Sequence, residues 1–184
     1  MNLIIVSGSE ATCKTFIGQT IAKSIGYEYL GKDTIKEAMF DQATHSAWDY
    51  RWYEARAKQE FFHRIEQLVI NNTDVVIESN FIGEDKVKLQ ACLHPGVNVR
   101  EVYCYSKGMT TLKRFVARNE NGQRHKGHHD RRWYTKILLE DLLLYVGVRW
   151  PSKPSGLGST LIEVNTTDLT KVSIQEIILS LHIK

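Results

Sequence analysis

The sequence contains few cysteines and prolines, the residues that cross-link or rigidify many small or secreted folds. Its 184 residues include only three cysteines and three prolines. The cysteines, at Cys13, Cys92 and Cys104, are scattered and form no C-x-x-C pair. This pattern favours reduced thiols in a cytoplasmic protein over a disulfide framework. A chain of this length can bury about 70% of its unfolded surface, so one domain can form a core without metal or disulfides.

Long apolar runs and a strong charge imbalance are also missing. A membrane-spanning helix needs roughly 18 consecutive apolar residues, and no run approaches this length. The most apolar stretch, from Ile137 to Val148, is interrupted by Glu140 and Asp141. The formal net charge is only +3, so the chain as a whole does not require a polyanionic partner. We therefore expect a globular domain without a membrane partner.

Short apolar runs rich in β-branched residues alternate with longer stretches of helical periodicity. The short runs predict strands at Leu3–Ser7, Tyr27–Leu30, Val75–Glu78, Val97–Tyr105 and Thr160–Val164. The longer stretches predict helices at about Lys14–Ile25, from Asp33 or Thr34 onward, and at Trp48–Asn71, Glu84–Leu93, Thr110–Asn119, Trp133–Val146 and Ser173–His182. Alternating strands and helices predict an α/β fold, with a parallel sheet covered on both faces.

Two patterns near the carboxyl terminus bear on domain organisation. Ser173 and Glu176 have the S-x-x-E spacing of a capping box, which predicts the start of the last helix. The run from Pro151 to Ser159 contains two of the three prolines and is typical of a surface loop. Too little chain follows this loop to fold alone. The sequence therefore predicts a single domain over residues 1–184.

The stretch VSGSEATCKT, from Val6 to Thr15, nearly matches the phosphate-binding pattern G-x-x-x-x-G-K-[ST]. It follows the first predicted strand and opens the first predicted helix, where backbone amides converge on phosphate. Lys14 would reach the β- and γ-phosphates, and the Thr15 hydroxyl would ligate Mg²⁺. The alternative is a simple strand–turn–helix. The predicted nucleotide-binding residues are Gly8, Ser9, Glu10, Ala11, Thr12, Cys13, Lys14 and Thr15.

Cys13 departs from this pattern, because the second glycine of the loop should stand at its position. Glycine there lets the backbone approach the phosphates without a Cβ atom. A cysteine side chain can be tolerated if it points away from the nucleotide, or it can weaken binding. The sequence leaves both possibilities open.

Acidic residues follow two further predicted strands. Asp33 comes after the second strand and Glu78 ends the third. In open α/β sheets the ligand crevice lies at the carboxyl ends of the strands, so both side chains are candidates for the site. Asp33 either acts on an acceptor or caps a helix, alone or beside a Thr34–Glu37 capping box. Glu78 is a candidate ligand of Mg²⁺ or of an acceptor, or else an exposed carboxylate at the edge of the sheet.

Positive charge is concentrated between Lys107 and Arg132. This segment has eight basic and two acidic residues, which gives a net charge of +6. Arg114 and Arg118 are four residues apart and share one helix face, and planar guanidinium groups suit phosphate oxygens. With glycines as flexible joints, the segment predicts a basic lid over the nucleotide that includes Arg124. One alternative is a solvated basic surface. Another is a zinc site at His125, His128 and His129, but no cysteine or carboxylate cluster stands at ligand spacing beside these histidines.

The loop above, together with YLGKDTIKEAMF, VVIESNF and TTLKRFVARNENGQRHKGHHD, resembles small P-loop kinases of the polynucleotide kinase, chloramphenicol phosphotransferase and zeta-toxin group. The resemblance runs from Leu3 to about Asp130. It implies a five-stranded parallel sheet in the order 2-3-1-4-5. It also implies that Asp33 acts on the acceptor hydroxyl, that Lys36 contacts the acceptor, and that arginines line a lid at residues 107–132. Many members have aspartate where this chain has Glu78.

The sequence thus predicts a P-loop kinase that moves the γ-phosphoryl group of ATP, with Mg²⁺, to the hydroxyl of a small molecule. The alternatives are a nucleic-acid 5′-hydroxyl kinase, a nucleotide-binding module without catalysis, and a nucleic-acid-binding protein that uses the basic segment. The predicted catalytic residues are Lys14, Asp33, Arg114, Arg118 and Arg124. The predicted acceptor-binding residues are Lys36 and Glu78, and the predicted metal-binding residues are Thr15 and Glu78.

Overall fold

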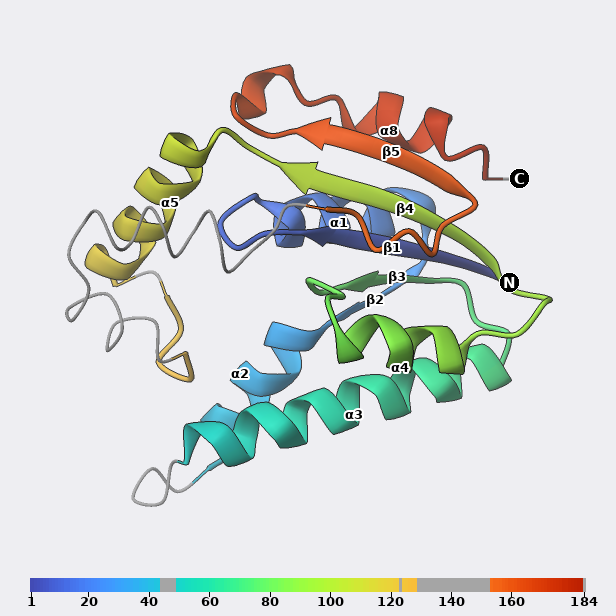
Figure 1. Ribbon diagram of the computed structural model, residues 1–184, viewed down its shortest axis with the longest axis horizontal. Coiled ribbons are helices and arrows are strands. Elements are labelled where there is room, and N and C mark those ends of the chain that lie inside the picture. The colour runs from blue at the N-terminus through green and yellow to red at the C-terminus, as the bar shows by residue number, and fades with distance from the viewer. Residues whose placement is uncertain (44–48, 123, 129–152, 184) are drawn as a thin grey trace.

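The computed structural model describes residues 1–43, 49–122, 124–128 and 153–183 (Figure 1). Its centre is a sheet in which every pair of neighbouring strands is parallel, in the order β2-β3-β1-β4-β5. This confirms the predicted α/β class, the five parallel strands and their order. The strands are β1 (Asn2–Gly8), β2 (Glu28–Gly31), β3 (Val75–Glu78), β4 (Asn98–Tyr105) and β5 (Thr160–Asn165).

Helices cover both faces of this sheet (Figure 1). On one face α1 and α8 pack on Ile4 and Val6, and on the other α3 and α4 pack on Leu3 and Ile5. These alternating β1 residues are all fully buried, which explains why the strand is continuously apolar. No helix among the described residues is both long and apolar enough to cross a membrane. The α-helices are α1 (Lys14–Ile25), α2 (Lys32–Gln42), α3 (Tyr50–Ile70), α4 (Glu84–Cys92), α5 (Gly108–Glu120) and α8 (Ile174–Ser180).

The predicted helix starts are close to the observed ones. The Asp49 carboxylate accepts hydrogen bonds from the amides of Arg51 and Trp52, so α3 begins at Tyr50. The Ser173 hydroxyl accepts from the Glu176 amide at 3.2 Å, which confirms the predicted cap of α8. A short 3₁₀ turn, Leu169–Lys171, precedes that cap. The helix predicted at Trp133–Val146 lies outside the described residues.

The described residues of the segment before β5, 153–159, form a loop as predicted, with Lys153, Gly156 and Ser159 exposed, but one of its residues is buried. Ser155 is buried because its amide and hydroxyl both donate to the carboxylate of Glu101 on β4, at 2.6 and 2.8 Å. Ser7 also donates to Glu101, at 2.6 Å, and Gly156 donates at 3.0 Å. Glu101 is only 1% exposed, and these four donors compensate for its lost hydration. The loop is therefore held by a buried carboxylate in the middle of a strand.

The strand register brings the predicted site residues to one edge. Glu78 lies opposite Val6 on one side and Gly31 on the other, so β1, β2 and β3 end side by side. Both α1 and α2 begin at this edge, one after a short loop and the other directly after β2. The carboxyl ends of parallel strands form the usual ligand crevice of such sheets.

Candidate functional site

The loop between β1 and α1 has the backbone of a phosphate-binding turn. Gly8 has φ of 143°, and a Cβ atom there would overlap the backbone carbonyl oxygen of Cys104. Ala11 and Cys13 both lie in the left-handed region, at φ of 57° and 61°. Alternation of right- and left-handed residues turns successive amides toward one concavity that binds anions. The loop therefore keeps the conformation that its sequence pattern predicts.

The conformation of Cys13 explains why the pattern has glycine at this position. Cys13 is the N-cap residue of α1 at φ 61° and ψ 17°, and its side chain makes no capping hydrogen bond. Left-handed backbone costs a residue with a Cβ roughly 1–2 kcal/mol, a cost that glycine does not have. Cysteine is thus accommodated in the glycine conformation at the expense of local strain.

We expect Cys13→Gly to bind Mg-ATP at least as tightly as the wild-type chain. The change relieves the left-handed strain, although glycine also gains about 0.4–1 kcal/mol of unfolded-state entropy. The free energy of unfolding should therefore rise by about 0–1.6 kcal/mol. Calorimetric titration with Mg-ATP and urea unfolding measure the two quantities. A large loss of nucleotide affinity would show that the loop uses the cysteine side chain.

Lys14, Thr15 and Glu78 form a connected group at the base of the loop. The Lys14 ammonium lies 3.4 Å from one oxygen of the Glu78 carboxylate, and the Thr15 hydroxyl donates to the other oxygen at 3.1 Å. Tyr29 on β2 donates to that same oxygen at 3.1 Å. Glu78 is buried, so the reading of it as an exposed edge carboxylate is wrong. A hydroxyl beside a carboxylate offers the hard oxygen donors that Mg²⁺ prefers, so these residues fit that ion.

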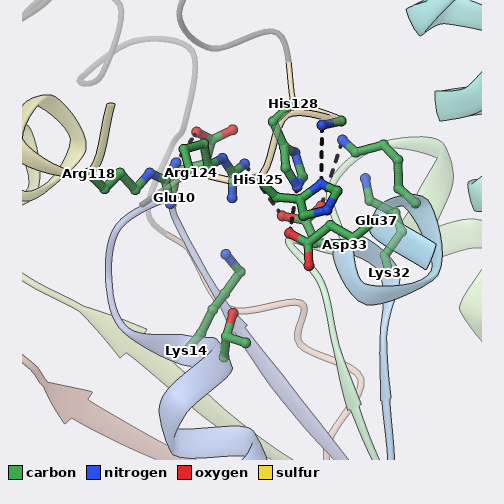
Figure 2. Close-up of polar contacts among 12 residues, drawn as sticks. Glu10, Lys14, Lys32, Asp33, Glu37, Arg118, Arg124, His125 and His128 are labelled. Atoms are coloured by element: carbon green, nitrogen blue, oxygen red, sulfur yellow. Dashed lines mark hydrogen bonds and ion pairs between the residues drawn. The ribbon is translucent and has the colours of Figure 1, made fainter. Parts of the chain in front are cut away.

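Asp33 lies in the first turn of α2, on the opposite side of the site. The N-cap of α2 is Gly31 and has no side-chain cap, so the capping interpretation of Asp33 and of Thr34–Glu37 is wrong. Its two carboxylate oxygens lie 3.6 Å from the Arg124 guanidinium and 3.9 Å from the Lys36 ammonium. Figure 2 shows Asp33 above and to one side of Lys14, whose side chain rises from the start of α1.

The charges around Asp33 determine its protonation. Burial raises the pKa of Asp33, but Lys36, His128, Arg124 and Lys14 together outweigh burial and hold that pKa well below its usual range. The side chain is 41% exposed, so water screens part of this effect. The group is ionised at neutral pH and accepts hydrogen bonds.

Lys36 is the most buried lysine of the site, with 4% of its surface exposed. Its ammonium contacts Glu54 of α3 at 2.7 Å, and Lys32 contacts the other oxygen of Glu54 at 3.1 Å. Burial raises the pKa of Glu54, but the two lysines outweigh burial and lower it. Glu54 was missed in the sequence because it lies inside a helix with no motif around it.

The three predicted lid arginines have different partners. Arg118 on α5 contacts the loop carboxylate of Glu10 at 3.2 Å, and Arg124 contacts Asp33 as described above. Arg114 instead donates to the backbone carbonyl of Thr166, at 2.7 Å, on the turn after β5. The structure thus brings Arg118 to the loop and Arg124 to α2 (Figure 2). The guanidinium of Arg114 is instead bound at the turn after β5.

Two lid histidines pack on α2 (Figure 2). His128 donates from Nε2 to Glu37 at 2.9 Å, and the His125 ring lies 3.1 Å from Asp41. Burial lowers the pKa of His128, although its hydrogen bond to Glu37 opposes this shift. No group of three or more metal-ligating side chains occurs in the described part of the chain, from which His129 is excluded. The histidines therefore attach the segment after α5 to α2.

These side chains border one small cavity of about 80 Å³. The loop, α1, α2, α3, β3 and the segment after α5 all contribute to its wall. Thr15 and Arg118 do not line the cavity itself, although both contact residues that do. The lining residues are Glu10, Lys14, Lys32, Asp33, Lys36, Tyr50, Glu54, Glu78, Ser79, Asn80, Arg124 and His128.

The parallel sheet, the anion-binding loop and the acidic strand end define the class of P-loop nucleotide-binding α/β proteins. A family model described as an AAA domain matches residues 3–135, so the chain belongs to that family of small P-loop kinases. No curated protein matches the sequence.

Solved structures agree with this class. A protein of Chloroflexus aurantiacus, described as a "putative kinase", is 28% identical, with a TM-score of 0.84 over 100% of this chain and 98% of that chain. Shikimate kinase of Bacteroides thetaiotaomicron shares the fold at 12% identity and a TM-score of 0.57, over 98% and 96% of the chains. A chain of the Pnkp1/Rnl/Hen1 RNA repair complex shares the fold at 15% identity and a TM-score of 0.55, over 83% of this chain and 47% of that chain.

Proposed function

We propose that this protein transfers the γ-phosphoryl group of ATP to a hydroxyl group of a small molecule. The proposal rests on one observation: Lys14 and Glu78 border the same cavity as Asp33, which lies on its opposite side. A triphosphate on the loop would place its γ-phosphate at this cavity. A hydroxyl beside Asp33 would then lie opposite the phosphate, as transfer requires.

Each side chain has a role that follows from its position. Lys14 and the loop amides bind the β- and γ-phosphates, and Arg118 and Arg124 neutralise the equatorial oxygens. Asp33 orients the acceptor hydroxyl by accepting its hydrogen bond, since a carboxylate with so low a pKa is a poor proton acceptor. Thr15 and Glu78 would hold Mg²⁺, which supplies positive charge to the phosphates when bound.

The size of the cavity favours a small acceptor. A space of about 80 Å³ suits a compact polar molecule better than a nucleic-acid strand. The basic segment and the fold shared with an RNA repair chain keep a nucleic-acid 5′-hydroxyl as the second candidate. A third candidate is a nucleotide-binding module without transfer, which Cys13 in the loop would favour.

A transfer screen with labelled ATP tests the proposal. Nucleosides, oligonucleotides, sugars, hydroxy acids and phenicol-like alcohols are offered to the wild-type chain and, in parallel, to Lys14→Ala. We expect the labelled phosphoryl group to be transferred to a small acceptor. The rate of this transfer should be about 10²–10³-fold lower with Lys14→Ala, because that variant loses a charge at the phosphates. Mg-ATP should also raise the melting temperature of the wild type, since a ligand of the folded state stabilises it.

Other outcomes point to the other candidates. Label on oligonucleotides alone, with an affinity that falls steeply as salt increases, would favour the nucleic-acid kinase. Thermal protection by Mg-ATP without label on any acceptor would favour the binding module. A lack of both protection and transfer would refute nucleotide chemistry at this loop.

A further inference from the structure

Two lysines on α2 flank the proposed position of the acceptor hydroxyl. Lys32 and Lys36 are four residues apart and therefore share one face of the helix, with Asp33 between them in the sequence. Both line the cavity that also contains Lys14 and Glu78. Figure 2 shows Lys32 beside Asp33 in the upper part of this site. Any molecule that presents a hydroxyl to Asp33 thus lies within reach of two ammonium groups.

These two ammonium groups share a single carboxylate. Lys32 lies 3.1 Å from Oε1 of Glu54 and Lys36 lies 2.7 Å from Oε2, so each oxygen binds one lysine. Asp33 is farther from Lys36, at 3.9 Å, and its other oxygen faces Arg124. Lys32, Lys36 and Arg124 thus carry three positive charges against the two negative charges of Glu54 and Asp33, which leaves the connected group with one positive charge. An ammonium as buried as that of Lys36 is stable only beside negative charge.

The position of Glu54 shows which anion the pair accommodates. The spacing of the two ammonium groups matches the two oxygens of a carboxylate, because Glu54 already bridges them in this way. Glu54 comes from α3, and its side chain is about one-third exposed, so it can share the lysines with an incoming anion. Three side chains from two helices thus form a ready carboxylate site next to Asp33.

We propose that the acceptor is a small hydroxy acid, whose carboxylate binds Lys32 and Lys36 while Asp33 orients its hydroxyl. This inference rests on the proposed function and specifies its substrate class. In the reaction, the hydroxyl oxygen bonds to the γ-phosphorus of ATP, and the bond from that phosphorus to the bridging β–γ oxygen breaks. ADP leaves, and the hydroxyl proton is released to solvent. The carboxylate of the acceptor stays intact and serves only for binding.

Matched pairs of acceptors test this inference. A panel of cyclic and linear hydroxy acids is assayed with labelled ATP, each beside its primary amide, which keeps the shape and loses the charge. The same panel includes phosphate esters of the corresponding alcohols. Binding of every compound is also measured by calorimetry, in the presence of Mg²⁺ and a non-hydrolysable ATP analogue. We expect at least one acid to exceed its amide in kcat/KM by at least tenfold.

The lysines are then tested with a charge-matched control. In Lys32→Gln/Lys36→Gln, the acid-to-amide ratio should fall toward one, while Mg-ATP still raises the melting temperature because Lys14 is intact. Lys23→Gln/Lys171→Gln removes the same charge from exposed positions and should keep the wild-type ratio. Retained thermal protection by Mg-ATP shows that the double variant is folded.

Four results would overturn the inference. They are equal use of acids and amides, an acid preference that survives Lys32→Gln/Lys36→Gln, a preference for phosphate esters over carboxylates, and a panel in which no acid binds or reacts. Transfer to neutral acceptors would refute only the substrate class and would leave the proposed kinase standing. Loss of both thermal protection by Mg-ATP and all transfer would instead refute the proposed function.

Discussion

Replacing Asp33 by asparagine is expected to lower kcat for phosphoryl transfer by roughly 10²-fold, the loss typical of a reacting group that is no longer held in position. The carboxylate is the hydrogen-bond acceptor that faces the phosphate loop from α2, and an amide presents only one oxygen and can turn its NH₂ group toward the hydroxyl. The affinity for Mg-ATP should stay the same or rise slightly, because Asp33 attracts Lys14 away from phosphate. Initial rates with labelled ATP and calorimetric titration measure the two effects.

Asp41→Asn is the matched control for this change. Asp41 lies on the same helix, is mostly exposed and contacts His125 rather than the cavity. Its replacement removes one negative charge from α2 and should leave kcat within about twofold of wild type, because surface ion pairs contribute little. Full turnover by Asp33→Asn would remove this residue from the mechanism. An equal loss in both variants would assign the effect to the charge of α2 instead.

Much of the fold could be predicted because its strands are buried on both faces. Apolar runs such as Leu3–Val6 leave few other interpretations, and the helix after each run follows from its periodicity. The strand order was implied by the resemblance to small P-loop kinases and by no local pattern. Pairing between strands distant in sequence, such as β1 with β4, leaves no mark in a short stretch of sequence.

The site was predictable where a residue follows a strand and less so where it lies inside a helix. Asp33 and Glu78 were found because parallel strands end at a common edge. Glu54 lies in the second turn of α3, and the only signal for it was the four-residue spacing of its partners Lys32 and Lys36. Glu101 interrupts an apolar strand, and such a buried charge requires partners that the sequence alone does not identify.

The lid arginines show a limit of helical spacing as a guide. Arg114 and Arg118 share a face of α5, which suggested that both reach the phosphates. In the structure, one guanidinium binds the turn after β5 and the other binds the loop between β1 and α1. Long side chains on neighbouring turns can extend in opposite directions, so residues with one spacing can have two partners.

Replacing Arg118 by alanine is expected to lower kcat by roughly 10³–10⁵-fold, which is the contribution of an arginine that stabilises transferring phosphate. The contact of Arg118 with Glu10, at 3.2 Å, shows that its guanidinium reaches the phosphate loop. Phosphate oxygens on the loop would compete with Glu10 for that guanidinium. Arg118→Lys should recover only part of the rate, because a lysine lacks the planar pair of donors. Single-turnover assays at saturating Mg-ATP separate this loss from weaker binding.

Two variants of the same neighbourhood distinguish this role from a structural one. Arg114→Ala removes a guanidinium from the same helix face but from the turn after β5, so it should reduce kcat far less than Arg118→Ala. Glu10→Gln removes the competing carboxylate and should tighten Mg-ATP binding while kcat is retained. Equal losses in Arg114→Ala and Arg118→Ala would show that α5 contributes only general positive charge. If Arg118→Ala retained full kcat, the lid would act without this arginine, and the stabilisation of the transferring group would have to come from Lys14 and Arg124.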